Sequence, residues 1–459
     1  GTRISQPLPP YYPRLELNRP KLSTFWFPYF RFKEPKVFRK VNSMKKFLLR
    51  TTVATTAVLA LAGCSSSSSD SAAGGSAEGG ADARGPITFA MGKNDTDKVT
   101  PIIEKWNEQH PDEKVTLKEL AGEADAQRET LVQSLQAGSD DYDVMALDVV
   151  WTAEFAANQW LQPLNGDFET NTDELLPATV ESATYNDVLY ALPQNTNGQL
   201  LFRNTELADK APEKFADLKS ACKALDKGKD CLTTQLKQYE GLALNTADFM
   251  EGWGGSVLDK DGNVTVDSKE AKDGLQAMVD AYKEETISKD STAATEEETN
   301  MAFTEGKTAF AMNWPYMYSN AVDAGIDVEV QAPLGKDGVG VSTLGGYNNG
   351  ININSKNKGT ALDFMKFIIN EDNQKSFAEQ SFPPVLASIY DDPQLQQEFP
   401  YLPALKESLE NAAPRPVSPF YSAISKAIQD NAYAALTDGK SVDDATADMK
   451  AAIESASQG

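Results

Sequence analysis

The chain has 459 residues, with 67 Asp and Glu against 43 Lys and Arg, which gives a formal charge of −24. So acidic a chain is repelled by nucleic acid and by anionic lipid, and we exclude nucleic-acid binding. With one histidine, His110, and three cysteines, it offers too few ligands for a zinc site. We expect neither a metal nor a cofactor.

Residues 44–63 have the order of an export signal. Met44 is followed by two lysines, and Arg50 closes the basic region before a run of small and apolar residues. That run is too short to span a bilayer, as is typical of a secretory signal peptide. It ends in Leu-Ala-Gly-Cys64, which resembles a bacterial lipobox, so we expect a lipid on Cys64 and anchoring to the outer face of the cell membrane. The alternative is a plain signal peptide with an incidental cysteine.

The segments on either side of the signal have different compositions. Residues 64–85 are mostly Ser, Gly, Ala and acidic residues, and predict a disordered tether that reaches roughly 25 Å. Residues 1–43 are rich in Pro, aromatic and basic residues. We interpret them as an upstream leader from a start assigned too early, the alternative being a basic, membrane-active prosegment. Residues 1–63 hold 12 basic and 2 acidic residues, so without them the formal charge is −34.

About 375 residues follow the tether, too many for one core, and predict two lobes. Predicted strands at 86–91, 115–120 and 142–147 alternate with predicted helices at 99–109 and 126–137, which favours a mostly parallel, doubly wound sheet. The later chain is richer in helix, with examples at 268–284, 359–370 and 419–436. No phosphate-binding glycine motif follows a strand, so a nucleotide site is not expected.

The two cysteines after the tether, Cys222 and Cys231, lie close together in the sequence. In an oxidising compartment such a pair predicts a disulfide that closes a small loop. His110 follows a predicted helix, and we interpret it as a surface residue rather than a catalyst.

Five segments carry a resemblance to a known family. They are YDVMALDVVWTAEF at 142–155, YALPQNTN at 190–197, FTEGK to NWPY at 303–316, LGGYNNGI at 344–351, and PRPVSPFY at 414–421. In this order they resemble the extracellular solute-binding proteins of ABC sugar importers, in particular the maltose- and trehalose-binding branch. The similarity runs from about residue 87 to near the C-terminus.

The resemblance implies a two-lobed, periplasmic-binding-protein-like α/β fold with a ligand cleft between the lobes. By analogy the chain crosses between lobes near Thr196, Tyr347 and Pro384. The first lobe is then 86–196 plus 348–384, and the second is 198–346 plus 385–459. The resemblance also implies a monomer that catalyses nothing and delivers a saccharide to ABC permease subunits in the membrane.

A sugar site needs carboxylates and amides for the hydroxyls and aromatic rings for the apolar faces. Asp148 lies at the end of a predicted strand, where doubly wound lobes bind ligands, and resembles the family's hydroxyl-binding aspartate. Its alternative role is the N-cap of the next helix. Trp314 matches the family's stacking tryptophan, with Tyr316 nearby, and core packing is the alternative.

Other ligand positions follow from the same resemblance. Asn195 and Asn197 lie on a crossing segment where relatives carry an aromatic residue and an aspartate or asparagine. Gly346 and Tyr347 stand where relatives often have tryptophan after two glycines. Arg415, between two prolines, has a fork that can hold two hydroxyls or can hold carboxylates such as Asp148 in place.

Four further candidates carry less support. Asn94 and Asp95 follow the first strand, a usual position at the rim of a cleft. Glu251 and Trp253 lie in a segment where relatives approach the ligand. A polar rim or core packing would explain all four equally well.

Two other function classes compete with the binding protein. A secreted glycosidase needs two carboxylates about 5–10 Å apart across the sugar bond, and the sequence distinguishes no such pair from an acidic surface. It also lacks a G-x-S-x-G elbow. An adhesive or structural surface lipoprotein is the third class. For the binding protein we expect an α-linked glucose disaccharide, trehalose or maltose, with another oligosaccharide as the alternative.

Overall fold

The computed structural model describes residues 79–458. The predicted leader, the signal peptide, the lipidation site at Cys64 and the tether up to residue 78 lie outside this range. Within residues 79–458, no helix combines the length and the apolar character that crossing a bilayer requires.

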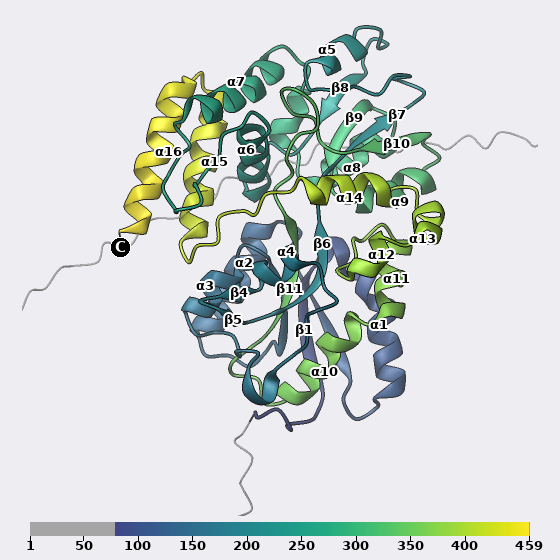
Figure 1. The fold of residues 1–459 in the computed structure, drawn as a ribbon, viewed down its shortest axis with the longest axis vertical. Coiled ribbons are helices and arrows are strands. Elements are labelled where there is room, and N and C mark those ends of the chain that lie inside the picture. Colours follow the sequence, from purple (N-terminus) through teal and green to yellow (C-terminus); the bar gives the residue numbers. More distant parts are fainter. Residues whose placement is uncertain (1–78, 459) are drawn as a thin grey trace, which may run out of the picture. The chain divides into compact units, whose positions relative to one another are not determined.

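Two sheets organise the described chain (Figure 1). The first has five strands in the order β2-β1-β3-β11-β6. Their bounds are Ile87–Gly92 (β1), Val115–Leu120 (β2), Val144–Asp148 (β3), Leu192–Asn197 (β6) and Gly345–Ile351 (β11). The second has four strands in the order β10-β7-β9-β8, at Leu200–Asn204 (β7), Asp230–Thr233 (β8), Thr308–Asn313 (β9) and Val328–Gln331 (β10). We call the five-stranded sheet and the helices packed on it the first lobe, and the four-stranded sheet and its helices the second lobe.

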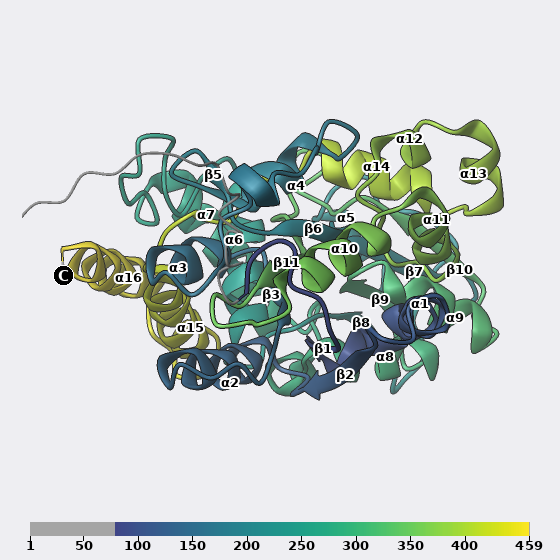
Figure 2. The same ribbon diagram turned by 90° about the horizontal axis from the view of Figure 1, so that it is seen from below.

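Helices cover both faces of the first sheet, which explains the nearly continuous apolar runs of β1 and β3. Phe89 and Met91 pack in the same cluster as α1 (Thr96–Gln109) and α10 (Lys358–Ile368). The intervening Ala90 packs in the cluster of α2 (Ala124–Gln136) and α3 (Thr152–Ala157). This alternation follows from the two-residue period of a strand. Figure 2 shows the same ribbon from below relative to Figure 1.

The second sheet is covered in the same way. Leu201 packs with α6 (Glu240–Gly252) and α7 (Lys269–Lys283), and α15 (Tyr421–Thr437) and α16 (Val442–Ser457) complete that layer. Leu200 and Phe202 pack on the other face, with α8 (Glu296–Thr304) and α9 (Tyr316–Asp323).

The remaining elements are short. They are α4 (Pro177–Ser182), α5 (Asp217–Ala221), α11 (Glu371–Glu379), α12 (Ala387–Tyr390), α13 (Pro393–Glu398), α14 (Leu402–Glu410), the hairpin β4 (Thr184–Tyr185) and β5 (Val188–Leu189), and 3-10 turns at Lys93–Asp95, Gly166–Phe168 and Lys289–Ala293.

The strands of each sheet run mostly in one direction, as predicted, with one exception in each. β11 is antiparallel to β3 and β6, and β7 is antiparallel to β9 and β10. Both exceptions enter their sheet directly from the other lobe, so they start at the edge where the other strands end. The carboxyl edges of both sheets therefore face each other.

The chain crosses between the sheets at residues 198–199 and 332–344. The predicted third crossing, near Pro384, lies beside the first one, because the Pro383 carbonyl accepts a hydrogen bond from the Thr196 amide (3.0 Å). Apolar residues between 385 and 405 pack in the cluster of the first sheet, while α14 contacts β7 and β10. The assignment of 385–459 to one lobe stays a prediction.

The end of the predicted tether differs from the expectation of disorder. Residues 79–85 form turns, and the Ala83 carbonyl accepts hydrogen bonds from the amides of Gly359 and Thr360 at the start of α10. The first amides of a helix have no partner within the helix, so this segment supplies one. Composition predicts how little apolar area a segment can bury, but not this backbone pairing.

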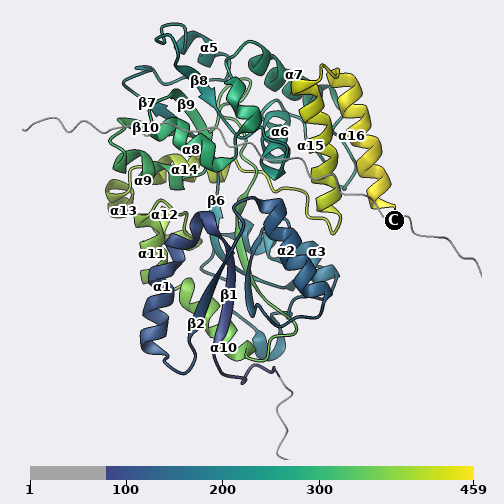
Figure 3. The same cartoon turned by 180° about the vertical axis from the view of Figure 1, so that it is seen from behind.

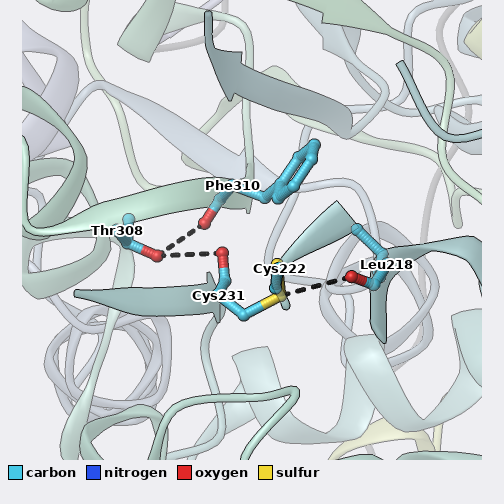
Figure 4. Close-up of a disulfide and its surroundings, with 5 residues drawn as sticks. All are labelled: Leu218, Cys222, Cys231, Thr308 and Phe310. Carbon is cyan, nitrogen blue, oxygen red and sulfur yellow. Dashed lines mark hydrogen bonds between the residues drawn. A yellow bond between two sulfur atoms is a disulfide. The ribbon is translucent and has the colours of Figure 1, made fainter. Parts of the chain in front are cut away.

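The predicted disulfide joins Cys222 and Cys231 in the second lobe, with their Cα atoms 5.5 Å apart (Figure 4). Cys222 follows α5, and Cys231 lies on β8. The Thr308 hydroxyl donates to the Cys231 carbonyl (3.3 Å) and ties this strand to β9. The bond therefore fixes the loop between α5 and β8 to the sheet.

Replacing both cysteines by alanine should lower the free energy of unfolding by about 2–3 kcal/mol. Without the bond, the loop between the two positions gains conformational freedom in the unfolded chain, which stabilises the unfolded state. Chemical denaturation of the variant and of the parent measures this. Reducing the parent with a thiol should reproduce the loss, and an unchanged unfolding midpoint in both samples would contradict a stabilising bond.

Candidate functional site

A polar cavity lies between the facing carboxyl edges of the two sheets. The first lobe contributes carboxylates, amides and Tyr347, and the second contributes aromatic rings and further carboxylates. The lining residues are Asn94, Asp95, Gly122, Ala124, Gln127, Asp148, Asn197, Gln199, Gln235, Tyr239, Glu240, Gly241, Leu244, Glu296, Trp314, Tyr316, Gly345, Gly346, Tyr347, Phe382 and Arg415.

Most of the predicted ligand positions meet in this cavity. Those that line it are Asn94, Asp95, Asp148, Asn197, Trp314, Tyr316, Gly346, Tyr347 and Arg415. They come from segments up to 321 residues apart in the chain, from Asn94 to Arg415. The sheet topology assembles them, because all except Arg415 lie at or just beyond the cleft end of a strand. Arg415 lies in the segment between α14 and α15.

Arg415 is buried among carboxylates, its side chain being 3% exposed. Its Nη2 donates to Asp148 Oδ1 (2.7 Å), its Nη1 to Glu240 Oε1 (2.9 Å), and its Nε to the Leu344 carbonyl (3.3 Å). The guanidinium fork thus joins two carboxylates at fixed angles. Of the two roles that the sequence leaves open for Arg415, the structure shows the one that holds Asp148 in place.

Glu240 is a member of this network that the sequence did not single out. It begins α6, where an acidic residue is ordinary, so its position gave no signal. Its carboxylate accepts hydrogen bonds from Arg415, from the Tyr421 hydroxyl and from the Ser425 hydroxyl. Burial raises the pKa of Glu240 to about 7, and Arg415 opposes this rise.

Asp148 does not cap the following helix. That helix, α3, begins at Thr152 with Trp151 at its N-cap position, so the alternative role predicted for Asp148 is wrong. Its Oδ1 accepts from the Val150 amide (3.2 Å) as well as from Arg415. β11 brings Tyr347 directly opposite Asp148 in the sheet register.

Trp314 directly follows β9, is half-buried and lies beside the first lobe. A Cβ on Gly345 would come within 2.8 Å of Trp314 Cη2 and within 3.0 Å of Asn197 Cβ. The glycine at 345 therefore leaves room for the indole ring against β11. Because the ring lines the cavity, its exposed part can stack on a ligand.

Two tyrosines hold carboxylates on opposite walls. The Tyr347 hydroxyl donates to Asp95 Oδ2 (3.0 Å) in the first lobe, and the Tyr239 hydroxyl donates to Glu296 Oε2 (2.7 Å) in the second. Burial raises the pKa of Asp95 to about 6 and also raises the pKa of Glu296, while these hydrogen bonds oppose the rise. Tyr239 and Glu296, like Gln199 and Gln235, gave no recognisable sequence signal.

Asn197 and Gln199 present hydrogen-bond acceptors to the cavity. Asn197 Oδ1 and Gln199 Oε1 are buried and have no hydrogen-bond partner among the described residues. A buried acceptor without a partner costs free energy, so both atoms favour a ligand that carries donors.

Three predicted ligand residues lie outside the cavity. Asn195 is buried within the first sheet, where its Oδ1 accepts from the Tyr347 amide (3.3 Å). Glu251 and Trp253 lie at the far end of α6 from Glu240, about 17 Å along the helix axis. Trp253 is half-buried and stacks on Phe249 with ring centroids 5.5 Å apart, outside the cavity.

No group of three or more His, Cys, Asp or Glu residues within 79–458 is arranged to hold a metal ion. The carboxylates of the cavity instead bind a guanidinium or tyrosine hydroxyls. This arrangement fixes acceptors for a polar solute.

Glu251 makes stability depend on pH. Burial, and secondly the nearby Asp248, raise the pKa of Glu251 to about 8. Between its unfolded value near 4.5 and 8, the folded chain binds a proton that the unfolded chain lacks. The contribution of this group to stability is therefore present at low pH and lost as the pH rises.

Glu251→Gln should therefore reduce the loss of unfolding free energy between pH 5 and pH 8, by on the order of 1–2 kcal/mol. Urea denaturation at both pH values measures the difference. Glu108→Gln, at an exposed position of α1, is the matched control and should leave the pH dependence unchanged. If the unfolding free energy of the parent and of the Glu251 variant falls equally between pH 5 and pH 8, Glu251 is not protonated in the folded chain.

Comparisons with known proteins agree with this geometry. The family model described as "Bacterial extracellular solute-binding protein" matches residues 102–403. The chain is 28% identical over 346 residues to a "Probable ABC transporter-binding protein" of Deinococcus radiodurans, over 70% of this chain and 82% of that protein. It is 22% identical over 333 residues to an "Arabinooligosaccharide-binding protein" of Halalkalibacterium halodurans, over 68% of this chain and 74% of that one.

A solved structure titled "Maltose bound T. maritima MalE3" superimposes with a TM-score of 0.74 at 31% sequence identity, and covers 80% of this chain and 99% of that one. The predicted two-lobed fold is thereby confirmed. The matched family consists of solute-binding proteins rather than enzymes, which agrees with the prediction of binding without catalysis. The match spans well over half of the chain, and the chain belongs to the family of bacterial extracellular solute-binding proteins.

Proposed function

We propose that the chain captures a small neutral saccharide in the cavity between the lobes and delivers it to the permease of an ABC importer. The observation that carries the proposal is that the half-buried Trp314 lines the same cavity as the acceptors on Asp148, Asn197 and Gln199. A sugar offers an apolar face for the ring and hydroxyl donors for the acceptors.

The charges of the cavity favour an uncharged ligand. Among the described residues that line the cavity, Arg415 is the only cationic side chain. Its guanidinium already forms ion pairs with Asp148 and Glu240. An anionic solute such as a sugar phosphate would meet carboxylates without a free cation to offset them. We therefore exclude acidic and phosphorylated sugars from the proposed ligands.

Within neutral saccharides we propose an α-linked glucose disaccharide, maltose or trehalose. The maltose-bound relative, at 31% identity, supports this choice, as does Trp314, which resembles the family's stacking tryptophan and lines the cavity. Another oligosaccharide is the second candidate, because the name of the Halalkalibacterium relative gives an arabinooligosaccharide as its ligand. One or two changes among the contacting residues can switch such preferences.

The proposal places the protein outside the cell as a monomer, held to the membrane by a lipid on Cys64. Its support is the lipobox-like sequence that ends the export signal. Cys64 lies outside the described residues, so this part of the proposal comes from the sequence.

Calorimetric titration with maltose, trehalose, maltotriose, sucrose, cellobiose and xylobiose tests the proposed function. We expect micromolar or tighter binding of maltose or trehalose, with the sugar recovered intact. Preference for a β-linked sugar would move the proposal to the second candidate. No heat of binding with any of the six would reject a saccharide receptor of this class.

Trp314→Ala should weaken binding of the preferred sugar by about 1–3 kcal/mol while the fold stays intact, because the stacking surface is lost. Trp253→Ala is the matched control, since it removes the same side chain from an aromatic cluster with Phe215 and Phe249 that lies outside the cavity. It should lower the unfolding free energy and leave the affinity unchanged. If Trp314→Ala instead unfolds the chain and the folded fraction binds normally, Trp314 is a core residue.

A further inference from the structure

The start of α2 in the first lobe lies against the start of α6 in the second (Figures 1 and 3). Asp125 Oδ2 accepts a hydrogen bond from the backbone amide of Glu240, the first residue of α6 (2.8 Å). The two residues are 115 positions apart in the sequence and belong to different lobes.

This contact acts as a helix cap for α6. The first amides of an α-helix have no partner within it, and a side chain just before the helix usually supplies one. Ser268 does so for α7, accepting from the Ala271 amide. The corresponding residue of α6 is Tyr239, whose side chain makes no capping bond. The cap of α6 therefore comes from the opposite lobe.

A second contact lies beside the first. The Glu123 carboxylate, immediately before α2, pairs with the Lys237 ammonium, three residues before α6. Two acidic side chains from the start of α2 thus meet an ammonium and the positive end of a helix. Both side chains of the ion pair are about two-fifths exposed, 41% for Glu123 and 42% for Lys237, so salt will screen it.

We propose that Asp125 and Glu123 form an interlobe latch that sets how firmly the lobes close, and so the affinity of the site, without touching the ligand. Gly122, Ala124 and Gln127 line the cavity, whereas Glu123 and Asp125 do not. The latch bonds exist only while the two helix starts are in contact. Asp125 and Glu123 are therefore positioning residues for Glu240, which does line the cavity.

The inference rests on the proposed function in one respect, that ligand binds the closed arrangement. The apparent dissociation constant is then the intrinsic one divided by the closed fraction. Removing a bond that forms only on closure lowers the closed fraction. It therefore raises the apparent dissociation constant of every ligand by a similar factor. A residue that contacts the sugar would instead change the ranking of sugars.

The decisive comparison is Asp125→Ala against Ser268→Ala in the full chain. Each removes one helix cap, but only the first cap crosses between lobes. We expect Asp125→Ala to weaken maltose and trehalose binding alike, by roughly three- to tenfold, the worth of a cap. Ser268→Ala should lower the unfolding free energy and leave both affinities unchanged.

Hydrogen exchange gives a readout that needs no sugar. In Asp125→Ala the amides at the start of α6 should exchange faster, while those at the start of α7 keep the parent rate. In Ser268→Ala the pattern should reverse. Unchanged exchange at the start of α6 in Asp125→Ala would overturn the latch even if no sugar in the panel binds.

A charge swap keeps the inference testable if Asp125→Ala does not fold. Glu123→Lys alone should weaken binding, and adding Lys237→Glu should restore it at low salt. Equal affinities for the parent, the single variant and the double variant would overturn the part of the latch that Glu123 supplies. Faster exchange without any loss of affinity would show that closure does not limit binding.

Discussion

The buried guanidinium of Arg415 is the interaction on which the site depends. It joins Asp148 of the first lobe to Glu240 of the second and also binds the Leu344 carbonyl. Removing one partner of a buried ion pair typically costs about 3–5 kcal/mol, since the remaining charge loses its compensation. The three side chains therefore have to be considered as one unit, which fixes the floor of the cavity and leaves further carboxylate lone pairs for a ligand.

The direction of the strands explains why this unit can form. Both sheets turn their carboxyl edges to the cleft, so residues after β1, β3 and β9 converge there. The two antiparallel strands, β7 and β11, start at the same place because the chain has just crossed from the other lobe. Polar residues at the first crossing and at the strand end beside it, such as Gln199 and Asn197, are buried there without satisfying all their acceptors. A ligand with hydroxyl groups would satisfy them and bias the lobes toward the closed arrangement.

The sequence predicted the alternating elements of the first lobe, the disulfide and nine of the residues that line the cavity, because strand ends and family-like segments are local features. It did not predict Glu240, Tyr239 or Glu296, whose roles arise from helix starts that tertiary packing turns toward the cleft. Trp253 and Glu251 were misplaced because α6 is 13 residues long and carries them away from its cavity end. The sequence did not predict the interlobe contact of Asp125 either, since nothing near Asp125 indicates a hydrogen bond to a residue 115 positions away.

The proposed site can be tested by a crystal structure of the chain grown with the tightest-binding saccharide. We expect a sugar ring against the exposed part of the Trp314 indole, with hydroxyls donating to Asp148, Asn197 and Gln199. We also expect Arg415 to keep its bonds to Asp148 and Glu240. A saccharide bound outside this cavity, or one whose hydroxyls displace Arg415 from both carboxylates, would show that the proposed site is wrong.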